Sequence, residues 1–284
     1  MRKGLLALLG AAVVSLTGCS MLYIDRSYNS VSQDSRAQFL ILHYTAIDNP
    51  KSLKVLTEGA VSSHYLVTDG AEDLPGHSSP KIFQLVHDHR RAYHAGLSSW
   101  KGHTQLNAAS IGIEIVNLGY RDGPSGREFF DYPDAQMDLV IRLVKKIVKE
   151  HDIRPDRILG HSDIAPLRKS DPGPRFPWKR LADEGLIPWP DQQNVAEKLT
   201  YYSTTLPNVL WFQQKLAEHG FDPPQSGELD KATRAMISAF QMKYRQSKFD
   251  GEPDAETAAI LDVMTSGGSV LRRAADMGSI HLAR

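Results

Sequence analysis

The sequence predicts an α/β protein in which a mixed central sheet is flanked by helices, followed by a small three-helix C-terminal domain. Short apolar runs of β type and one long amphipathic segment occupy residues 36–190. Three further helical patterns, separated by turn glycines, follow residue 206. A length of 284 residues suits two domains, since a domain usually takes roughly 150 residues.

The strands of the first domain are read from continuous apolar runs. Residues 39–45 (FLILHYT) form the most apolar run, too continuous for a half-exposed strand, so we expect it to be buried on both faces. Weaker strand-like runs cover 64–68, 81–86, 110–116 and 157–161.

A long helix is predicted between Tyr132 and Asp152. Asp131 is the expected N-terminal cap and Pro133 suits the first turn. Charged residues occupy the other face of this helix, and the apolar face is formed by Met137, Val140, Ile141, Val144, Ile147 and Val148.

The C-terminal part contains a weak internal repeat. Residues 227–233 (GELDKAT) match residues 251–257 (GEPDAET), so each copy places a turn glycine before an Asp-x-x-Thr helix start. A third helix is expected over residues 207–219. Residues 191–205, which are polar, are expected to be a linker, and residues 269–284 a tail.

The N-terminus has the anatomy of an export signal. Two cations precede an apolar run of about twelve residues, short of the roughly 20 that span a bilayer. The segment Leu16-Thr17-Gly18-Cys19 resembles the lipobox of bacterial lipoproteins. That resemblance implies a signal peptide over residues 1–18, acylation of Cys19 and a lipidated tether over residues 19–35. With Ser20 next, it also implies an anchor in the bacterial outer membrane, facing the periplasm.

Composition excludes several classes of function. Lys plus Arg equal Asp plus Glu at 33 each, and this balance argues against a nucleic-acid-binding protein. The single cysteine excludes an intramolecular disulfide and a four-thiolate zinc site. The chain has no Gly-x-Ser-x-Gly turn, which argues against serine hydrolysis.

Histidines at strand ends indicate a metal site. His43 ends the most apolar strand and His161 ends another, while Glu114 sits within the apolar strand-like run 110–116. A carboxylate in that setting needs a partner or a function, because burying it alone is costly. Two imidazoles and one carboxylate suit catalytic zinc, which keeps a fourth position for water.

Several motifs occur in the order found in one known family. They are Leu42-His43-Tyr44-Thr45, Ser63-His64-Tyr65-Leu66-Val67, Tyr93-His94-Ala95-Gly96, Ser110-Ile111-Gly112-Ile113-Glu114, and the block from His161 to Trp178. With these motifs the chain resembles the zinc-dependent N-acetylmuramoyl-L-alanine amidases of the AmpD/AmiD type, which are related in fold to peptidoglycan-recognition proteins. The resemblance implies a zinc amidase domain over residues 36–190.

The same resemblance implies roles for individual residues. The zinc ligands would be His43, His161 and Asp171, with Glu114 as the catalytic glutamate and Lys169 assisting at the transition state. Four more residues are candidates for substrate binding, each with a purely structural reading beside it: His64, His94, Trp100 and Arg168.

The implied substrate is peptidoglycan or its muropeptide fragments, cut between N-acetylmuramic acid and L-alanine. Residues 206–268 resemble the peptidoglycan-binding domain of cell-wall hydrolases, although a structural cap on the first domain would give the same pattern. Two other functions stay open: a non-catalytic peptidoglycan receptor, and a zinc peptidase acting on stem peptides.

Overall fold

The computed structural model describes residues 22–270 except 75, 77 and 125, in two units that meet between Asp34 and Ser35. The described part of the first unit, residues 22–34, contains no helix or strand. The expected signal peptide and Cys19 lie outside the described residues. Within the described part of the chain, no helix has the length and apolar character needed to span a bilayer.

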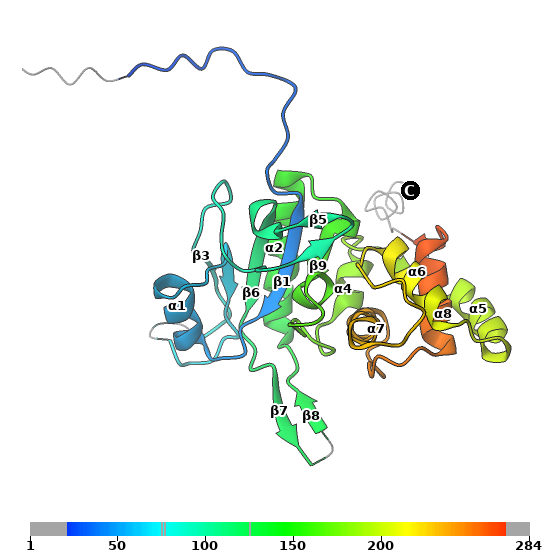
Figure 1. Cartoon of the computed structure of the whole chain (residues 1–284). Helices are drawn as coiled ribbons and strands as arrows, with labels where there is room; N and C mark the ends of the chain where they lie inside the picture. The colour runs from blue at the N-terminus through cyan, green and yellow to red at the C-terminus, as the bar shows by residue number, and fades with distance from the viewer. Residues whose placement is uncertain (1–21, 75, 77, 125, 271–284) are drawn as a thin grey trace, which may run out of the picture. The chain divides into compact units, whose positions relative to one another are not determined.

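A five-stranded mixed sheet forms the centre of the second unit (Figure 1). Four strands are parallel and β3 is antiparallel to β2. The order across the sheet is β3 (Ile82–Gln84), β2 (Tyr65–Val67), β6 (Ser110–Ile115), β1 (Phe39–Tyr44) and β9 (Ile158–Gly160). The predicted mixed sheet flanked by helices is confirmed.

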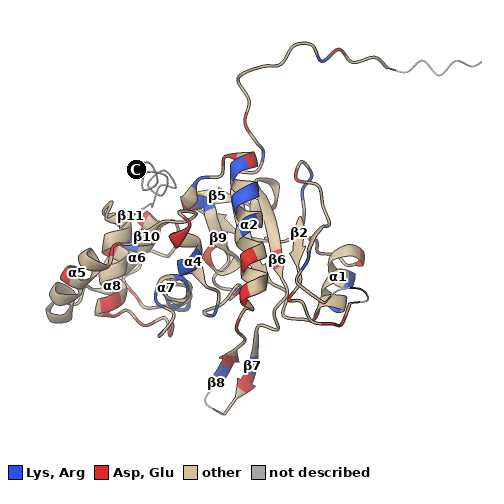
Figure 2. Ribbon diagram, turned by 180° about the vertical axis from the view of Figure 1, so that it is seen from behind, with Lys and Arg blue, Asp and Glu red and all other residues tan. Residues whose placement is uncertain are grey.

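Helix α2 (Asp134–His151) lies along the back of this sheet (Figure 2). Its apolar face is buried against Leu40 and Leu42 of β1, and its outer face carries the charged residues. The N-terminal cap position is Pro133, so the expected cap Asp131 is wrong. Asp131 lies two positions before the cap, out of reach of the first turn, and instead pairs with Arg175 at 3.7 Å.

Shorter elements surround the sheet. One more expectation is corrected here, because His161 does not extend β9 but begins α3. The remaining elements of this part are α1 (Asn49–Glu58), β4 (Ser99–Trp100), β5 (His103–Thr104), β7 (Tyr120–Gly123), β8 (Gly126–Phe129), α3 (His161–Ile164), α4 (Trp178–Asp183), β10 (Trp189–Pro190) and β11 (Ser269–Val270).

The helical module at the C-terminal end contains the three predicted helices and one more. Helices α6 (Val209–His219), α7 (Lys231–Tyr244) and α8 (Ala255–Thr265) match the expected positions. The segment 191–205, expected to be a linker, forms α5 (Gln192–Thr204). Asp191 caps it by accepting a hydrogen bond from the Asn194 amide, and Val195 and Tyr202 are buried in the module core.

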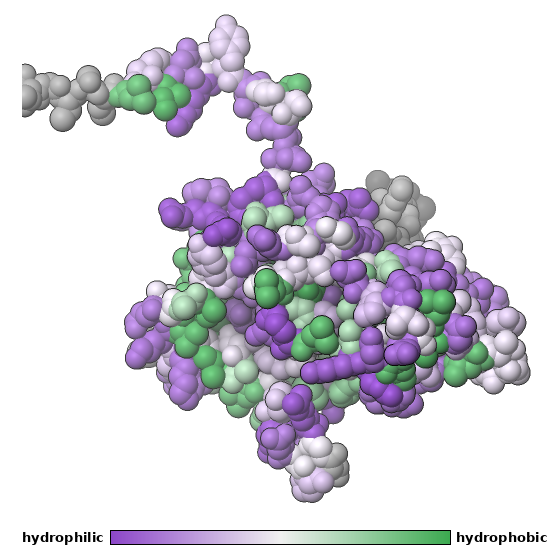
Figure 3. Space-filling view, in the orientation of Figure 1, coloured by the Kyte–Doolittle hydropathy of each residue, from purple (hydrophilic) through white to green (hydrophobic). Residues whose placement is uncertain are grey.

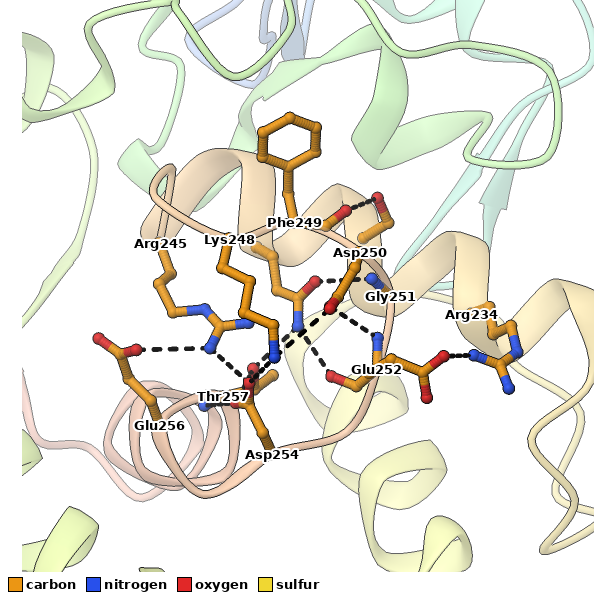
Figure 4. A network of polar contacts seen from close by, with 12 residues as sticks. Arg234, Arg245, Lys248, Phe249, Asp250, Gly251, Glu252, Asp254, Glu256 and Thr257 are labelled. Carbon is orange, nitrogen blue, oxygen red and sulfur yellow. Dashed lines mark hydrogen bonds and ion pairs between the residues drawn. The ribbon is translucent and has the colours of Figure 1, made fainter. Parts of the chain in front are cut away.

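The internal repeat has the same hydrogen bonds in both copies. A buried glutamine on one helix accepts from the turn glycine and donates to a threonine in the first turn of the next helix. The two sets are Gln213 with Gly227 and Thr233, and Gln241 with Gly251 and Thr257. Figure 4 shows the turn of the second copy, around Gly251, Glu252 and Thr257. These two glutamines therefore define the turns of the module.

The module shares a core with the sheet. Side chains alternate along β1, so that Leu40 and Leu42 face α2 while Phe39 and Ile41 join the apolar cluster that contains Phe212 and Phe240 of the module. Trp100 packs edge-on against Phe221, with ring centroids 5.2 Å apart. The module is thus packed against the first domain through a continuous apolar interface.

Candidate active site

Three buried side chains converge at one point beside the sheet. The Nδ1 atoms of His43 and His161 are 2.9 Å apart, and each is 3.1 Å from Oδ2 of Asp171. These three residues are at most 6% exposed. The structure therefore brings together the three side chains that the sequence resemblance assigned as metal ligands.

The topology explains this convergence. His43 is near the carboxyl end of β1, and His161 follows the carboxyl end of β9, its parallel neighbour. Ligand sites of α/β sheets form at this edge. Asp171 lies on the following loop, which is fixed to α3 because the Ser162 amide donates to the Asp171 carbonyl at 2.8 Å.

The charge states of this cluster suit a cation. Burial and the neighbouring His161 lower the pKa of His43 to about 4. Although burial acts to raise the pKa of Asp171, the two histidines hold it well below its usual range. A neutral imidazole and an ionised carboxylate are the forms that bind metals, and two nitrogens and one oxygen suit zinc with a position left for water.

Hydrogen bonds on the far side of each ring orient the two histidines. His161 Nε2 lies 3.1 Å from the Ala95 carbonyl, and His43 Nε2 lies 3.0 Å from His94 Nδ1. His94 Nε2 in turn lies 3.2 Å from the Ser110 hydroxyl. With Nδ1 of His43 facing the cluster, its Nε2–H donates to His94, which then donates to Ser110.

Gly112 makes room for this arrangement. A Cβ on Gly112 would lie 2.6 Å from the His94 ring, so a larger residue at this position of β6 would displace His94.

Glu114 lies beside the cluster on the adjacent strand. It is in register with His43 across the β1–β6 pair and is partly buried. Its Oε2 atom is buried without a hydrogen-bond partner among the described residues. Burial and the nearby Asp171 raise the pKa of Glu114 well above its usual range, and Lys169 opposes this shift. A free, proton-accepting carboxyl group of this kind is typical of a catalytic acid or base.

A cavity of about 240 Å³ opens onto these groups. One side is polar and includes His94, Glu114, His161, Lys169 and Asp171. The apolar part of the lining is formed by Ile47, Val55, Leu56 and Val61, on and around α1, where Figure 3 shows apolar surface. The cavity can therefore hold a substrate that has both a polar reacting group and apolar substituents.

Comparison with known proteins decides the family. Residues 33–174 match the N-acetylmuramoyl-L-alanine amidase family model, and residues 205–261 match the putative peptidoglycan binding domain. The chain is 38% identical over 264 residues to the N-acetylmuramoyl-L-alanine amidase AmiD of Escherichia coli, covering 89% of this chain and 95% of that one. The chain is an N-acetylmuramoyl-L-alanine amidase. The family and enzyme class predicted from the sequence are confirmed.

Solved structures resemble this amidase over most of its length. AmpDh3 from Pseudomonas aeruginosa has a TM-score of 0.80 at 38% identity, covering 87% of this chain and 99% of that one. Escherichia coli AmiD, in complex with anhydro-N-acetylmuramic acid-L-Ala-D-gamma-Glu-L-Lys, has a TM-score of 0.76 at 37% identity, covering 86% and 95%.

Three of the four candidate substrate contacts in this amidase, His64, Trp100 and Arg168, do not line the active-site cavity. His64 is fully buried, and its Nδ1 accepts from the Gly112 amide. Trp100 is 2% exposed and packs on the helical module. Arg168 donates to the carbonyls of Ala95 and Leu97, which fixes the loop that holds His161. His94 alone of the four lines the cavity.

Two residues of the site, Tyr44 and Ser110, were not predicted from the sequence. Tyr44 lines the cavity, and its hydroxyl lies 3.1 Å from that of Ser170. Tyr44 directly follows His43 at the end of the strand, and this position could have indicated that it lies near the site. The Ser110 hydroxyl completes the chain from His43, but nothing in the sequence distinguishes it from other serines at strand starts.

Proposed function

We propose that this amidase is zinc-dependent and cleaves the amide bond between N-acetylmuramic acid and L-alanine in peptidoglycan or its muropeptide fragments. The observation that carries the proposal is the convergence of His43, His161 and Asp171 next to Glu114, beside one cavity. Among the described residues, Oε2 of Glu114 has no hydrogen-bond partner. The ligand of the AmiD complex supports anhydro-muramyl peptides as substrates.

Each residue of the site would have a distinct role in the reaction. His43, His161 and Asp171 would hold zinc, which supplies Lewis acidity and lowers the pKa of bound water toward about 7. Glu114 would take the proton of the attacking water and return it to the leaving amine of L-alanine. Its raised pKa in the metal-free site would fall beside a divalent cation, which restores the basic form near neutral pH.

Lys169 would stabilise the charge that develops on the amide oxygen. It is exposed, lines the same cavity, and carries the positive charge that opposes the raised pKa of Glu114. A cation aimed at a developing oxyanion acts mainly on the transition state, so its removal should lower kcat more than it changes KM.

Product analysis tests this proposal. The purified protein is incubated with a defined anhydro-muramyl tripeptide and with sacculi, before and after chelation and again after zinc is restored. We expect mass spectrometry to show a sugar without peptide, lost on chelation and regained with zinc. A peptidase would leave L-alanine on the sugar, and a receptor would bind both substrates without releasing products.

We further propose that the chain is a lipoprotein, acylated at Cys19 and anchored in the outer membrane facing the periplasm. The lipobox-like segment before Cys19 supports this. Cells grown with radiolabelled palmitate should label the wild-type protein but not Cys19→Ala. Equal labelling of the two, or no labelling of the wild type, would contradict acylation at Cys19.

The helical module is proposed to hold peptidoglycan near the active site, which the match of residues 205–261 supports. Linking two binding sites raises the local concentration of a polymeric substrate but not of a small one.

A further inference from the structure

A lysine of the helical module reaches into the domain that carries the active site. Lys243 of α7 is only 4% exposed, and its Nζ lies 2.8 Å from Oδ2 of Asp163 and 3.2 Å from the Ile158 carbonyl. The ammonium also lies 4.4 Å from the centre of the Trp178 ring. Both oxygens that receive this cation therefore lie across the interface, on residues of β9 and α3.

Asp163 transmits this contact to a metal ligand. The Oδ2 atom that receives Lys243 also accepts the Gly160 amide at 2.8 Å, and so closes the turn between β9 and α3. His161 follows Gly160 directly and is the first residue of α3. Asp163 is 2% exposed, so without Lys243 it would be a buried carboxylate that has lost its counter-charge.

The turn at Gly160 is packed so closely against the loop of Asp171 that a displacement of the turn would move both His161 and Asp171. A Cβ on Gly160 would lie 2.7 Å from Cδ of Pro172, the residue after Asp171. The Ser162 amide holds the Asp171 carbonyl at 2.8 Å. Any shift of the turn therefore moves His161 and Asp171 relative to His43.

We propose that the helical module positions the metal site: Lys243, acting through Asp163, fixes the turn that presents His161. Lys243 is a positioning residue, because it contacts neither the cavity nor the ligand atoms. This role adds to peptidoglycan binding by the module and rests on the proposed metal site.

Zinc affinity tests the proposal directly. Dissociation constants are measured by competition with a chromogenic chelator for the wild type, Lys243→Met, Asp163→Asn and the double variant. We expect Lys243→Met and Asp163→Asn each to weaken zinc binding by about tenfold, as for partners just outside a metal's ligands. When Asp163→Asn is already present, Lys243→Met should have no further effect. Equal affinity of Lys243→Met and wild type, or an undiminished effect of Lys243→Met in the presence of Asp163→Asn, would overturn the proposal.

Hydrogen exchange of the metal-free protein provides a readout that needs no zinc. Amides of residues 158–165 should exchange faster in Lys243→Met than in the wild type. The matched control is Phe249→Ala, which removes another contact across the same interface, with Phe129 of β8 at 5.7 Å between ring centroids. In Figure 4 the Phe249 ring points away from the polar network of its turn. The control should leave both exchange and zinc affinity in this turn unchanged.

The outcomes separate the two proposals. If the wild type binds no zinc, the proposed metal site fails. If the wild type binds zinc and Lys243→Met binds it equally well, only the positioning role fails. If Lys243→Met does not fold, the double variant can be used instead, because it leaves no unpaired buried charge. The zinc affinity of the double variant should then equal that of Asp163→Asn and be lower than that of the wild type; any other result overturns the proposal.

Discussion

Buried polar side chains are arranged differently in the helical module and in the active site. In the module, Gln213 and Gln241 use both their oxygen and their nitrogen in hydrogen bonds to the turn that follows. In the active site, two ring nitrogens face one carboxylate oxygen, and Oε2 of Glu114 has no partner among the described residues.

This difference in hydrogen bonding distinguishes buried polar side chains that stabilise the fold from those that serve the reaction. A buried glutamine with all its hydrogen bonds made stabilises one turn geometry, because losing any partner leaves a buried polar group unpaired. A buried carboxyl without a partner opposes folding and is retained where chemistry needs it. Substitutions in the two regions should therefore separate stability from activity.

The largest effect is expected for Glu114→Gln. The variant keeps the shape of the side chain but cannot take a proton, so kcat on a muropeptide should fall by about 10²–10⁴-fold. Zinc content should be unchanged, and the free energy of unfolding should be unchanged or higher, because a buried ionisable group is removed. Full activity in this variant would mean that another group is the base.

Gln241→Ala should lower stability and leave activity unchanged, the reverse of what is expected for Glu114→Gln. It leaves the Gly251 amide and the Glu252 carbonyl without their partner, which should cost about 1–3 kcal/mol per buried group in urea unfolding. Hydrolysis of a small muropeptide by the folded fraction should stay at the wild-type rate. The matched control, Gln214→Ala at an exposed position of α6, should change stability by less than about 0.5 kcal/mol.

An intermediate effect is expected for His94, because it lies within hydrogen-bond distance of His43, one of the three proposed zinc ligands. His94→Phe keeps a ring beneath Gly112 but removes the acceptor for His43. Zinc affinity, measured by chelator competition, should fall by about 10–100-fold. A variant that binds zinc as tightly as the wild type would show that His43 needs no orienting partner.

At any single pH step the change expected from His219, which packs against Trp100 at the interface between module and sheet, is the most gradual of these effects. Burial lowers the pKa of His219 from about 6.5 to about 3. Between these values the unfolded chain binds the proton and the folded chain does not, so stability is complete above pH 6.5 and is lost as the pH falls toward 3.

This histidine should contribute about 1.4 kcal/mol per pH unit to the slope of unfolding free energy. His219→Phe should reduce the slope between pH 4 and 6 by that amount in urea unfolding of the metal-free protein. The control Phe221→Leu changes a neighbouring ring that carries no titratable group, and it should leave the slope unchanged. An identical slope in His219→Phe would show that His219 is protonated in the folded state.

The sequence predicted the parts that depend on local pattern. These parts are the apolar run of β1, the amphipathic helix α2 and the repeat of the module. They could be predicted because burial and helical periodicity follow from the order of apolar and polar residues within a short segment. The ligand set came from the resemblance to a family, since no local pattern shows that Asp171 faces His43.

What the sequence did not predict depends on packing between distant segments. Helix α5 looked like a polar linker because only Val195, Leu199 and Tyr202 pack on the module core. Trp100 was a candidate substrate contact, and only the folded chain shows that the module covers it. Lys243 likewise acquires its role from Asp163, 80 residues away.

The central claim is the proposal that His43, His161 and Asp171 bind zinc. Zinc titration of the purified, chelator-treated protein tests it most directly. Isothermal titration should show one zinc ion per chain, with a matching rise in Tm, and Asp171→Asn should weaken binding strongly. Absence of zinc binding by the wild type, or equal binding by Asp171→Asn, would contradict the account.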